Sequence, residues 1–384
     1  INVAPGTYSE QFSLRDIPGS SSINTVLIDG QNSNLATLTH DQSSRNSTVT
    51  LERVQYVEIK NLTIEATATS DSWGVHIFDS SHHVSLDSNR ILMPIGSNSD
   101  VAGIMISNSE TSDASQYFNA FNTRITNNEV VGGERGISAY GDFSDLNIDL
   151  LIENNTVHSS YDYGIYVYYF DSVYVRGNEV NNIQSSAGDA LYMSDVENFE
   201  VSGNFLIGQD NGMDADDLNF NNAVVSNSQI FNNMFVGGDD GAYFDDSESI
   251  DFYHNSFKGE DYGVYANDHL NWELKNNIFY GNTNYAFYTP DSLAITMDYN
   301  VYYTGGSDLI RFGGTTNIYA DLLAFQAAAP TLNVNSLEGD PVFTSANNLH
   351  LIGSIANDVG DNSIGINVDI DGDSRPLSPS TTVD

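Results

Sequence analysis

Two acid-dense turns stand out in this sequence of 384 residues. The first spans residues 210–217 (DNGMDADD) and the second spans residues 239–246 (DDGAYFDD), and neither contains Lys or Arg. Carboxylates a few ångströms apart repel each other by about 1 kcal/mol per pair even in water, so such clusters favour a bound cation or shared protons. Calcium prefers oxygen ligands. We therefore expect a Ca²⁺ site whose ligands are Asp214, Asp216, Asp217, Asp239 and Asp240.

The same carboxylates could also perform acid–base chemistry on a glycosidic bond. That reaction uses two carboxyl groups, one donating a proton and the other acting as a base or nucleophile. The expected catalytic residues are Asp216, Asp240 and Asp245. Asp216 and Asp240 are 24 residues apart, which is about one repeat of the pattern described next, so we expect them on neighbouring repeats.

A repeated asparagine sets the register of the chain from residue 84 onward. Each of these asparagines has an apolar residue three places before it and another two places after it. Successive spacings are 39, 27, 23, 26, 29, 22, 22 and 23 residues, which indicates a solenoid with loop insertions. The asparagines are Asn89, Asn128, Asn155, Asn178, Asn204, Asn233, Asn255, Asn277 and Asn300.

The residues around these asparagines predict strands. Val, Ile, Tyr and Phe alternate with polar residues, and helix formers are scarce. We predict an all-β fold, a single right-handed parallel β-helix of about ten or more coils spaced about 4.8 Å apart. The asparagine amides are expected to form an internal ladder, because a buried amide must be hydrogen-bonded.

The expected organisation is a β-helix over residues 1–320 followed by a C-terminal cap over residues 321–384. Residues 321–328 (DLLAFQAA) are the one convincing helical segment, and a short helix there would cover the open edge of the last coil. The sequence begins directly in a strand-like segment, which we interpret as the start that remains after removal of a targeting segment.

The pattern resembles the pectate-lyase-like superfamily of secreted parallel β-helices. The opening INVAPGTYSE resembles the first coil of many members, and residues 339–343 (GDPVF) with residues 369–376 (DIDGDSRP) resemble the closing segment of secreted bacterial β-helix proteins. This superfamily includes lyases, hydrolases, epimerases and non-catalytic adhesins, so the resemblance implies a fold and export more than an activity.

A narrower resemblance concerns the calcium-binding coils of polysaccharide lyase family nine. The segments DADD and GGDDGAY resemble the DADG and DDGWD of that family, which implies Asp216, Asp239 and Asp240 as calcium ligands. The sequence departs from the family where Tyr243 replaces an acid. The catalytic lysine of the family also has no counterpart, since the outward positions on the later coil hold Tyr265 and Asn267.

An aromatic strip is expected on the outside of the same coils. If the apolar residues of segments such as Gly164-Ile165-Tyr166 point inward, alternation turns the following aromatic outward. Such a strip could stack on sugar rings or contact a partner, or simply stabilise the sheet. The expected substrate-binding residues are Tyr166, Tyr243, Tyr265, Arg135 and His269, and Phe287 is expected to continue the strip.

Composition limits the partners. The chain has 52 acidic residues, 12 Lys and Arg, a formal net charge of −40 and no cysteine. Nucleic acid is excluded as a partner, because phosphate binding needs clustered basic residues. No apolar run approaches the length of a membrane-spanning helix, so we expect no membrane insertion.

Two functions remain open, and both place the protein outside the cell or on its surface. The first is a carbohydrate-active β-helix that cleaves or binds an extracellular polysaccharide, with an acidic polymer and calcium dependence expected, acting as a lyase or a hydrolase. The second is a non-catalytic adhesin or filament-forming β-helix that contacts cell-surface glycans or associates with itself.

Overall fold

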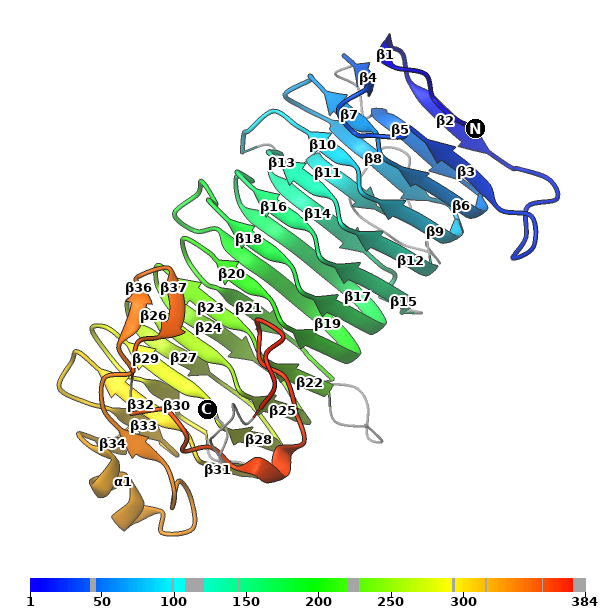
Figure 1. Cartoon of the computed structure of the whole chain (residues 1–384). Coiled ribbons are helices and arrows are strands. Elements are labelled where there is room, and N and C mark those ends of the chain that lie inside the picture. Colours follow the sequence, from blue (N-terminus) through cyan, green and yellow to red (C-terminus); the bar gives the residue numbers. More distant parts are fainter. Residues whose placement is uncertain are drawn as a thin grey trace. The chain divides into compact units, whose positions relative to one another are not determined.

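The computed structural model is built almost entirely of short parallel strands (Figure 1). It describes residues 1–41, 46–97, 100–107, 121–143, 146–219, 228–291, 294–314, 316–353 and 355–375. The chain divides into two compact units, Ile1–Phe199 (unit 1) and Glu200–Asp384 (unit 2). Each unit is a parallel β-helix in which every full coil contributes one strand to each of three ladders, here called ladders 1, 2 and 3. The predicted fold is confirmed.

In unit 1, strands one coil apart pair in parallel. Ladder 1 consists of β1 (Gly6–Ser9), β4 (Ala36–His40), β7 (Thr63–Ala66), β10 (Arg90–Leu92), β13 (Glu129–Val131), β16 (Thr156–His158) and β18 (Glu179–Asn181). Ladder 2 consists of β2 (Phe12–Arg15), β5 (Asn46–Glu52), β8 (Ser72–Phe78), β11 (Val101–Ile106), β14 (Arg135–Tyr140) and the first half of β17 (Tyr163–Arg176). Ladder 3 consists of β3 (Val26–Asp29), β6 (Gln55–Lys60), β9 (His82–Asp87), β12 (Phe121–Thr126), β15 (Asn147–Glu153) and the second half of β17.

Unit 2 repeats this arrangement, and the long strand β19 (Asp189–Ser202) ends inside it. Ladder 1 consists of β20 (Phe205–Ile207), β23 (Met234–Gly237), β26 (Ser256–Gly259), β29 (Ile278–Gly281), β32 (Val301–Thr304) and β35 (Leu337–Glu338). Ladder 2 consists of β21 (Met213–Asp216), β24 (Asp240–Asp245), β27 (Tyr262–Ala266), β30 (Phe287–Thr289) and β33 (Ile310–Phe312). Ladder 3 consists of the end of β19, β22 (Ser228–Phe231), β25 (Ile250–Tyr253), β28 (Trp272–Lys275) and β31 (Ile295–Asp298).

The nine repeated asparagines form the predicted ladder at the turn between ladders 3 and 1. All nine are buried, with at most 2% of each residue exposed. In unit 2, for example, the Asn277 Oδ1 accepts hydrogen bonds from the Asn255 backbone N–H (3.0 Å) and Nδ2 (3.0 Å), while Asn255 Nδ2 also donates to the Ile230 carbonyl (2.7 Å). Each amide therefore joins three successive coils, and its burial is compensated by hydrogen bonds.

The core follows from the apolar residues that flank each asparagine. In unit 2, the aromatic residues two places after it stack along the axis, Phe235 on Phe257 with ring centroids 4.9 Å apart and Phe257 on Phe279 at 5.5 Å, with Tyr302 continuing the stack. Val, Ile and Leu fill the equivalent positions in unit 1. The strands face this core on one side only, which agrees with the alternation of apolar and polar residues in the sequence.

The C-terminal part of unit 2 closes the last coil and then folds back. Helix α1 (Leu322–Ala328) has Asp321 as its N-cap and buries Phe325, whose ring contacts Phe312 of β33 and Tyr319 of β34 (Ile318–Tyr319) edge to face. The predicted helix is thus confirmed in position and packing.

After the helix, the chain forms the antiparallel hairpin β36 (Phe343–Ser345) and β37 (Asn348–Leu351), orange in Figure 1, and a single 3₁₀ turn at Asn362–Ile364. The hairpin covers the outer face of ladder 1, where Leu349 packs with Met234 and Val236. Among the described residues, no helix has the length and apolarity needed to cross a membrane.

Candidate functional site

A four-residue motif in ladder 2 determines which side chains face outward. In unit 2, it reads Asp240-Gly241-Ala242-Tyr243, Tyr262-Gly263-Val264-Tyr265 and Tyr285-Ala286-Phe287-Tyr288. The two middle residues are buried, so the first and fourth share the outer face, as the contact between the Tyr262 and Tyr265 rings (5.4 Å) demonstrates. A Cβ on Gly263 would lie 2.4 Å from the Ala286 carbonyl oxygen, so this close approach of the coils requires glycine.

Five tyrosines, here called the tyrosine face, form two columns on this outer surface: Tyr243, Tyr265 and Tyr288 in one, and Tyr262 and Tyr285 in the other. In the first column, ring centroids are 5.0 Å apart from Tyr243 to Tyr265 and 4.4 Å from Tyr265 to Tyr288. Each ring covers the face of its neighbour, and Tyr243, Tyr262, Tyr265 and Tyr285 are partly exposed whereas Tyr288 is buried.

A carboxyl group heads each column. Asp214 of β21 pairs with Tyr243 of β24, and Asp240 of β24 pairs with Tyr262 of β27. At the far end of the first column, the Arg311 guanidinium lies 4.7 Å from the centre of the Tyr288 ring. The face therefore runs from an acidic end on β21 and β24 to one basic side chain on β33.

Burial separates these two carboxyls from the other acids. It raises the pKa of Asp214 to about 7, with Asp216 and Asp210 adding like-charge repulsion. It raises the pKa of Asp240 to about 8, with Asp239 adding to the shift and a hydrogen bond from the Tyr262 backbone N–H (3.2 Å) opposing it. Both carboxyls therefore keep a proton to a much higher pH than an ordinary aspartate does.

The tyrosines remain neutral over a wider range. Burial raises the pKa of Tyr265 to about 12, and neighbouring tyrosines add to the shift. Burial and nearby aspartates also raise the pKa of Tyr243, and Asp245, Asp214, Asp216 and Asp240 all contribute to it. Tyr243 thus lies within the electrostatic reach of every expected catalytic carboxyl.

A third column on the same strands consists of acids that could hold a cation. Asp216 pairs with Asp245, and Asn267 Nδ2 donates to Asp245 Oδ1 (2.9 Å). Carboxylate oxygens of Asp216, Asp217 and Asp246 lie within 4.8 Å of one another, as do those of Asp245, Asp246 and Asp268. These oxygen donors suit Ca²⁺, although three residues provide only part of its usual six to eight ligands.

The expected ligand set is therefore divided in space. Asp216 and Asp217 are in one of these groups with Asp246, whereas Asp239 and Asp240 lie at the opposite end of β24, and neither group among the described residues includes Asp214. Asp216 and Asp240 lie on neighbouring coils, as expected, but they do not face each other, because β21 pairs with β24 at an offset of 29 residues.

In unit 1, Arg135 and Tyr166 contact each other on the outer face of ladder 2. The Arg135 guanidinium lies 4.3 Å from the centre of the Tyr166 ring, and its Nε lies 3.1 Å from a Glu134 oxygen. Tyr166 also stacks on Tyr192, with centroids 4.8 Å apart. The same four-residue motif places these side chains, as Arg135-Gly136-Ile137-Ser138 and Tyr163-Gly164-Ile165-Tyr166.

Two expected outward residues lie inside unit 2. His269 is 1% exposed, its Nε2 lies 2.8 Å from Thr289 Oγ1, and burial lowers its pKa to about 4. Phe287 is fully buried and pairs with Val264, while Tyr288 takes the outward place beside Tyr265. The expectation that Phe287 continues the outward strip is therefore wrong by one residue.

Sequence reasoning missed Tyr262, Tyr285, Tyr288 and Arg311 as members of the face. The spacing of the motif could have identified the tyrosines. Its first residue is Asp or Tyr, its second is Gly or Ala, and its fourth is Tyr. Strict strand alternation does not predict that the two middle residues of the motif both face inward.

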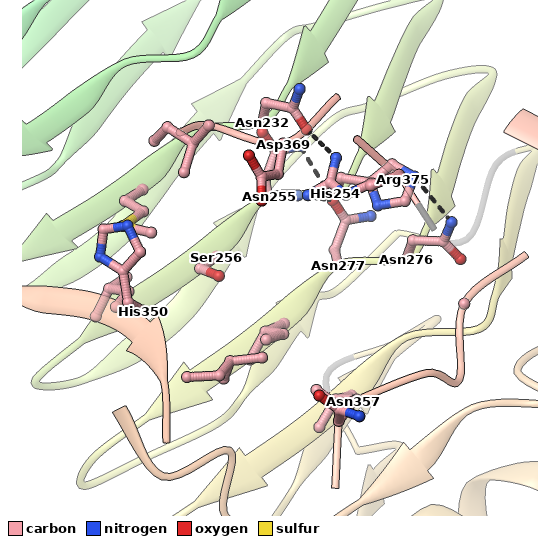
Figure 2. A pocket seen from close by; sticks show the side chains of 18 of the residues that line it. Asn232, His254, Asn255, Ser256, Asn276, Asn277, His350, Asn357, Asp369 and Arg375 are labelled. Atoms are coloured by element: carbon pink, nitrogen blue, oxygen red, sulfur yellow. Dashed lines mark hydrogen bonds between the residues drawn. The ribbon is translucent and has the colours of Figure 1, made fainter. Parts of the chain in front are cut away.

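A separate cavity of about 320 Å³ lies between the C-terminal tail and ladder 1 of unit 2. Figure 2 shows Asn232, His254, Asn276 and Arg375 close together, with His350 and Asn357 apart from them. These groups bind one another or the tail: Arg375 donates to Asn232, Asn232 Nδ2 to the Val368 carbonyl (2.8 Å), and His350 Nε2 lies 2.9 Å from Asp371. The cavity thus belongs to the packing of the tail.

Comparisons with known proteins agree with the fold. Residues 147–301 match the family model of the right handed beta helix region. The search of curated proteins finds no match.

Similar solved structures include the A-module of mannuronan C-5 epimerase AlgE6 from Azotobacter vinelandii (12% identity, TM-score 0.48, covering 88% of each chain). They also include the catalytic unit of a GH87 α-1,3-glucanase from Streptomyces thermodiastaticus (10% identity, TM-score 0.43, covering 83% of this chain and 64% of that one). A third is the surface protein and adhesin PfbA of Streptococcus pneumoniae (11% identity, TM-score 0.38, covering 88% and 91%).

Proposed function

We propose that this protein is a carbohydrate-active β-helix that binds an extracellular polysaccharide on the tyrosine face and cleaves it with the carboxyls beside it. The observation that carries the proposal is the arrangement of two tyrosine columns, each headed by a carboxyl whose pKa is near neutrality, the half-buried Asp214 or the buried Asp240. Perturbed carboxyls that converge on an exposed binding surface are typical of functional sites.

Glycan binding on this face would use hydroxyl groups more than ring stacking. The rings of Tyr243 and Tyr265 stack on their neighbours, so their partly exposed edges and hydroxyls are what a ligand meets. A phenolic hydroxyl both donates and accepts hydrogen bonds. Successive hydroxyls on coils about 4.8 Å apart form a regular row of partners for the hydroxyls of a polymer.

The chemistry that we assign is hydrolysis. Asp240, protonated up to about pH 8, would donate its proton to the glycosidic oxygen as the bond from that oxygen to the anomeric carbon breaks. Asp210, whose charge acts on both Asp214 and Asp240, would accept a proton from the water whose oxygen bonds to that carbon. Asp214 would provide a second proton-bearing group beside Tyr243.

The test is release of reducing ends from a panel of polysaccharides by the wild type and by Asp240→Asn. We expect the variant to lose turnover by about 10²- to 10⁴-fold, the usual contribution of a general acid, with binding retained. In the wild type, turnover should fall as the pH rises through about 8, where Asp240 loses its proton. Asp340→Asn, an exposed acid in the C-terminal tail, is the matched control. Full turnover in Asp240→Asn would contradict the catalytic assignment.

Binding is tested separately with Tyr262→Phe and Tyr265→Phe, which keep the rings and remove the hydroxyls. We expect each to weaken retention on the polysaccharide about 3- to 10-fold, the effect of one net hydrogen bond. Tyr303→Phe, on the outer side of ladder 1, is the control. Binding without any turnover in the wild type would support the adhesin alternative, while equal binding by all variants would remove the tyrosine face from the proposal.

We also propose a calcium site in the third column. Asp246 is shared by both carboxylate groups that could hold a cation, so Asp246→Asn should abolish calcium binding, whereas Asp239→Asn should leave it unchanged. Isothermal titration calorimetry of the three proteins checks this. Loss of binding in Asp239→Asn alone would instead support the ligand set expected from the sequence.

A further inference from the structure

We propose that the tyrosine face selects a polysaccharide without carboxylate or sulfate groups, so that its substrate class is a neutral glycan. This inference rests on the proposed function and names the substrate of the same site. It differs from the acidic polymer expected from the sequence.

The first ground is the charge of the segments that form the face. Residues 208–217, 237–249 and 259–271 contain no Lys or Arg. Their acids surround the tyrosine columns at both ends of β24, and they are Asp210, Asp214, Asp216, Asp217, Asp239, Asp240, Asp245, Asp246, Glu248, Glu260, Asp261 and Asp268. A uronate or sulfate placed here would meet like charges without a compensating cation.

The second ground is the position of the basic residues of unit 2 and the groups that they contact. Three of them contact the C-terminal tail, away from the tyrosine face: Lys258 Nζ donates to the Ala346 carbonyl (2.8 Å), Lys275 lies 3.7 Å from Asp361, and Arg375 donates to the Val368 carbonyl (3.1 Å). In the described part of unit 2, Arg311 is the one basic side chain that borders the face, and its guanidinium lies against Tyr288.

The third ground is the hydrogen-bonding character of the face. The tyrosine hydroxyls are neutral partners, and the ionised carboxylates accept hydrogen bonds only. Sugar hydroxyl groups can donate to both. A carboxylate or sulfate can only accept, so it could use the tyrosine hydroxyls but would repel the carboxylates.

The experiment compares matched pairs of polymers that differ only in charge. Amylose, β-1,3-glucan and galactomannan are each used in native form and after oxidation of the primary hydroxyl groups to carboxylates. Retention of the whole protein is measured by affinity electrophoresis in EDTA, at about 0.05 M and about 0.5 M salt. We expect at least one native polymer to retain the protein about tenfold or more tightly than its carboxylated form at low salt. The difference should narrow at high salt because screening weakens repulsion.

A double variant links this selectivity to the face. Asp216→Asn/Asp245→Asn should reduce the difference between native and carboxylated polymer, whereas Asp340→Asn/Asp358→Asn, which removes the same charge from the tail, should not. Equal or tighter retention of a carboxylated polymer, with or without added calcium, would overturn the inference and leave the proposed function standing. Retention of neither form by any pair would contradict the proposed function itself, and the inference with it.

Discussion

Burial, more than the number of acids, gives Asp214 and Asp240 their chemistry. Several aspartates lie in each of the two acid-dense turns. Only Asp214 and Asp240 combine burial with like-charged neighbours strongly enough to bring the pKa near 7 and 8, respectively. A carboxyl kept protonated near neutral pH can donate a proton, which an ordinary surface aspartate cannot do there.

The same burial makes stability depend on pH. The folded-state pKa of Asp240 lies above its ordinary value of 3.8, so the folded protein binds more protons than the unfolded chain between about pH 4 and 8, and stability falls as the pH rises through this window. Asp240→Asn removes this contribution. We expect the variant to be more stable than the wild type by about 1 to 3 kcal/mol near pH 8.5 and nearly equal near pH 4.

Urea unfolding at the two pH values measures the difference. Asp340→Asn serves again as the control, since this exposed acid lies outside the face. A stability difference that does not change with pH would contradict the raised pKa of Asp240.

At this scale, the sequence indicates which acids matter but not how they group. The excess of Asp over basic residues in residues 210–246 points to a site. The division of the acids between the head of a tyrosine column and the third column depends on the offset of 29 residues between β21 and β24, which the average repeat length does not predict. The sequence also does not show that His269 is buried. Its ring lies inside unit 2 and stacks on Trp272, with ring centroids 4.6 Å apart.

Among the structural elements, the asparagine ladder was the most predictable. All nine asparagines are found where the register places them, because one buried amide per coil has to satisfy the same hydrogen bonds repeatedly. The outward strand was less predictable. Two successive residues of its motif face inward, as Ala286 and Phe287 do, so a strict alternation misplaces Phe287 and omits Tyr288.

The ladder predicts a strong effect of a single asparagine. Asn255→Ala would leave the Asn233 backbone N–H and the Ile230 carbonyl without their side-chain partner, and we expect it to lower the free energy of unfolding by about 2 to 4 kcal/mol. Asn357→Ala, an exposed residue bonded to its neighbour Asp358, should change it by less than about 0.5 kcal/mol. Equal effects in urea unfolding would show that the ladder does not stabilise the coils.

Over the whole molecule, charge is the dominant property. Some of the 52 acidic residues form local ion pairs, such as Glu129 with Arg90, but the 12 Lys and Arg leave a formal net charge of −40. The acids of the third column have like-charged neighbours. Self-repulsion of this kind opposes the compact state. The composition alone predicts this self-repulsion, without any knowledge of the fold.

We therefore expect salt to stabilise the protein. Raising NaCl from about 0.02 to about 0.5 M should raise the melting temperature, because the Debye length shortens and repulsion is screened. Calorimetric melting curves test this, with an uncharged solute at equal osmolality as the control. A melting temperature that falls with salt would mean that the ion pairs outweigh the repulsion.

The equal coils between Asn233 and Asn277 have a consequence for how such a chain can evolve. Residues 234–255 and 256–277 are both 22 residues long and place Phe235, Phe257 and Phe279 in the same register. Duplication or loss of one such segment would preserve both the amide ladder and the aromatic stack. It would also lengthen or shorten the tyrosine columns by one coil. The number of 22-residue units would therefore set the length of polymer that the protein can bind.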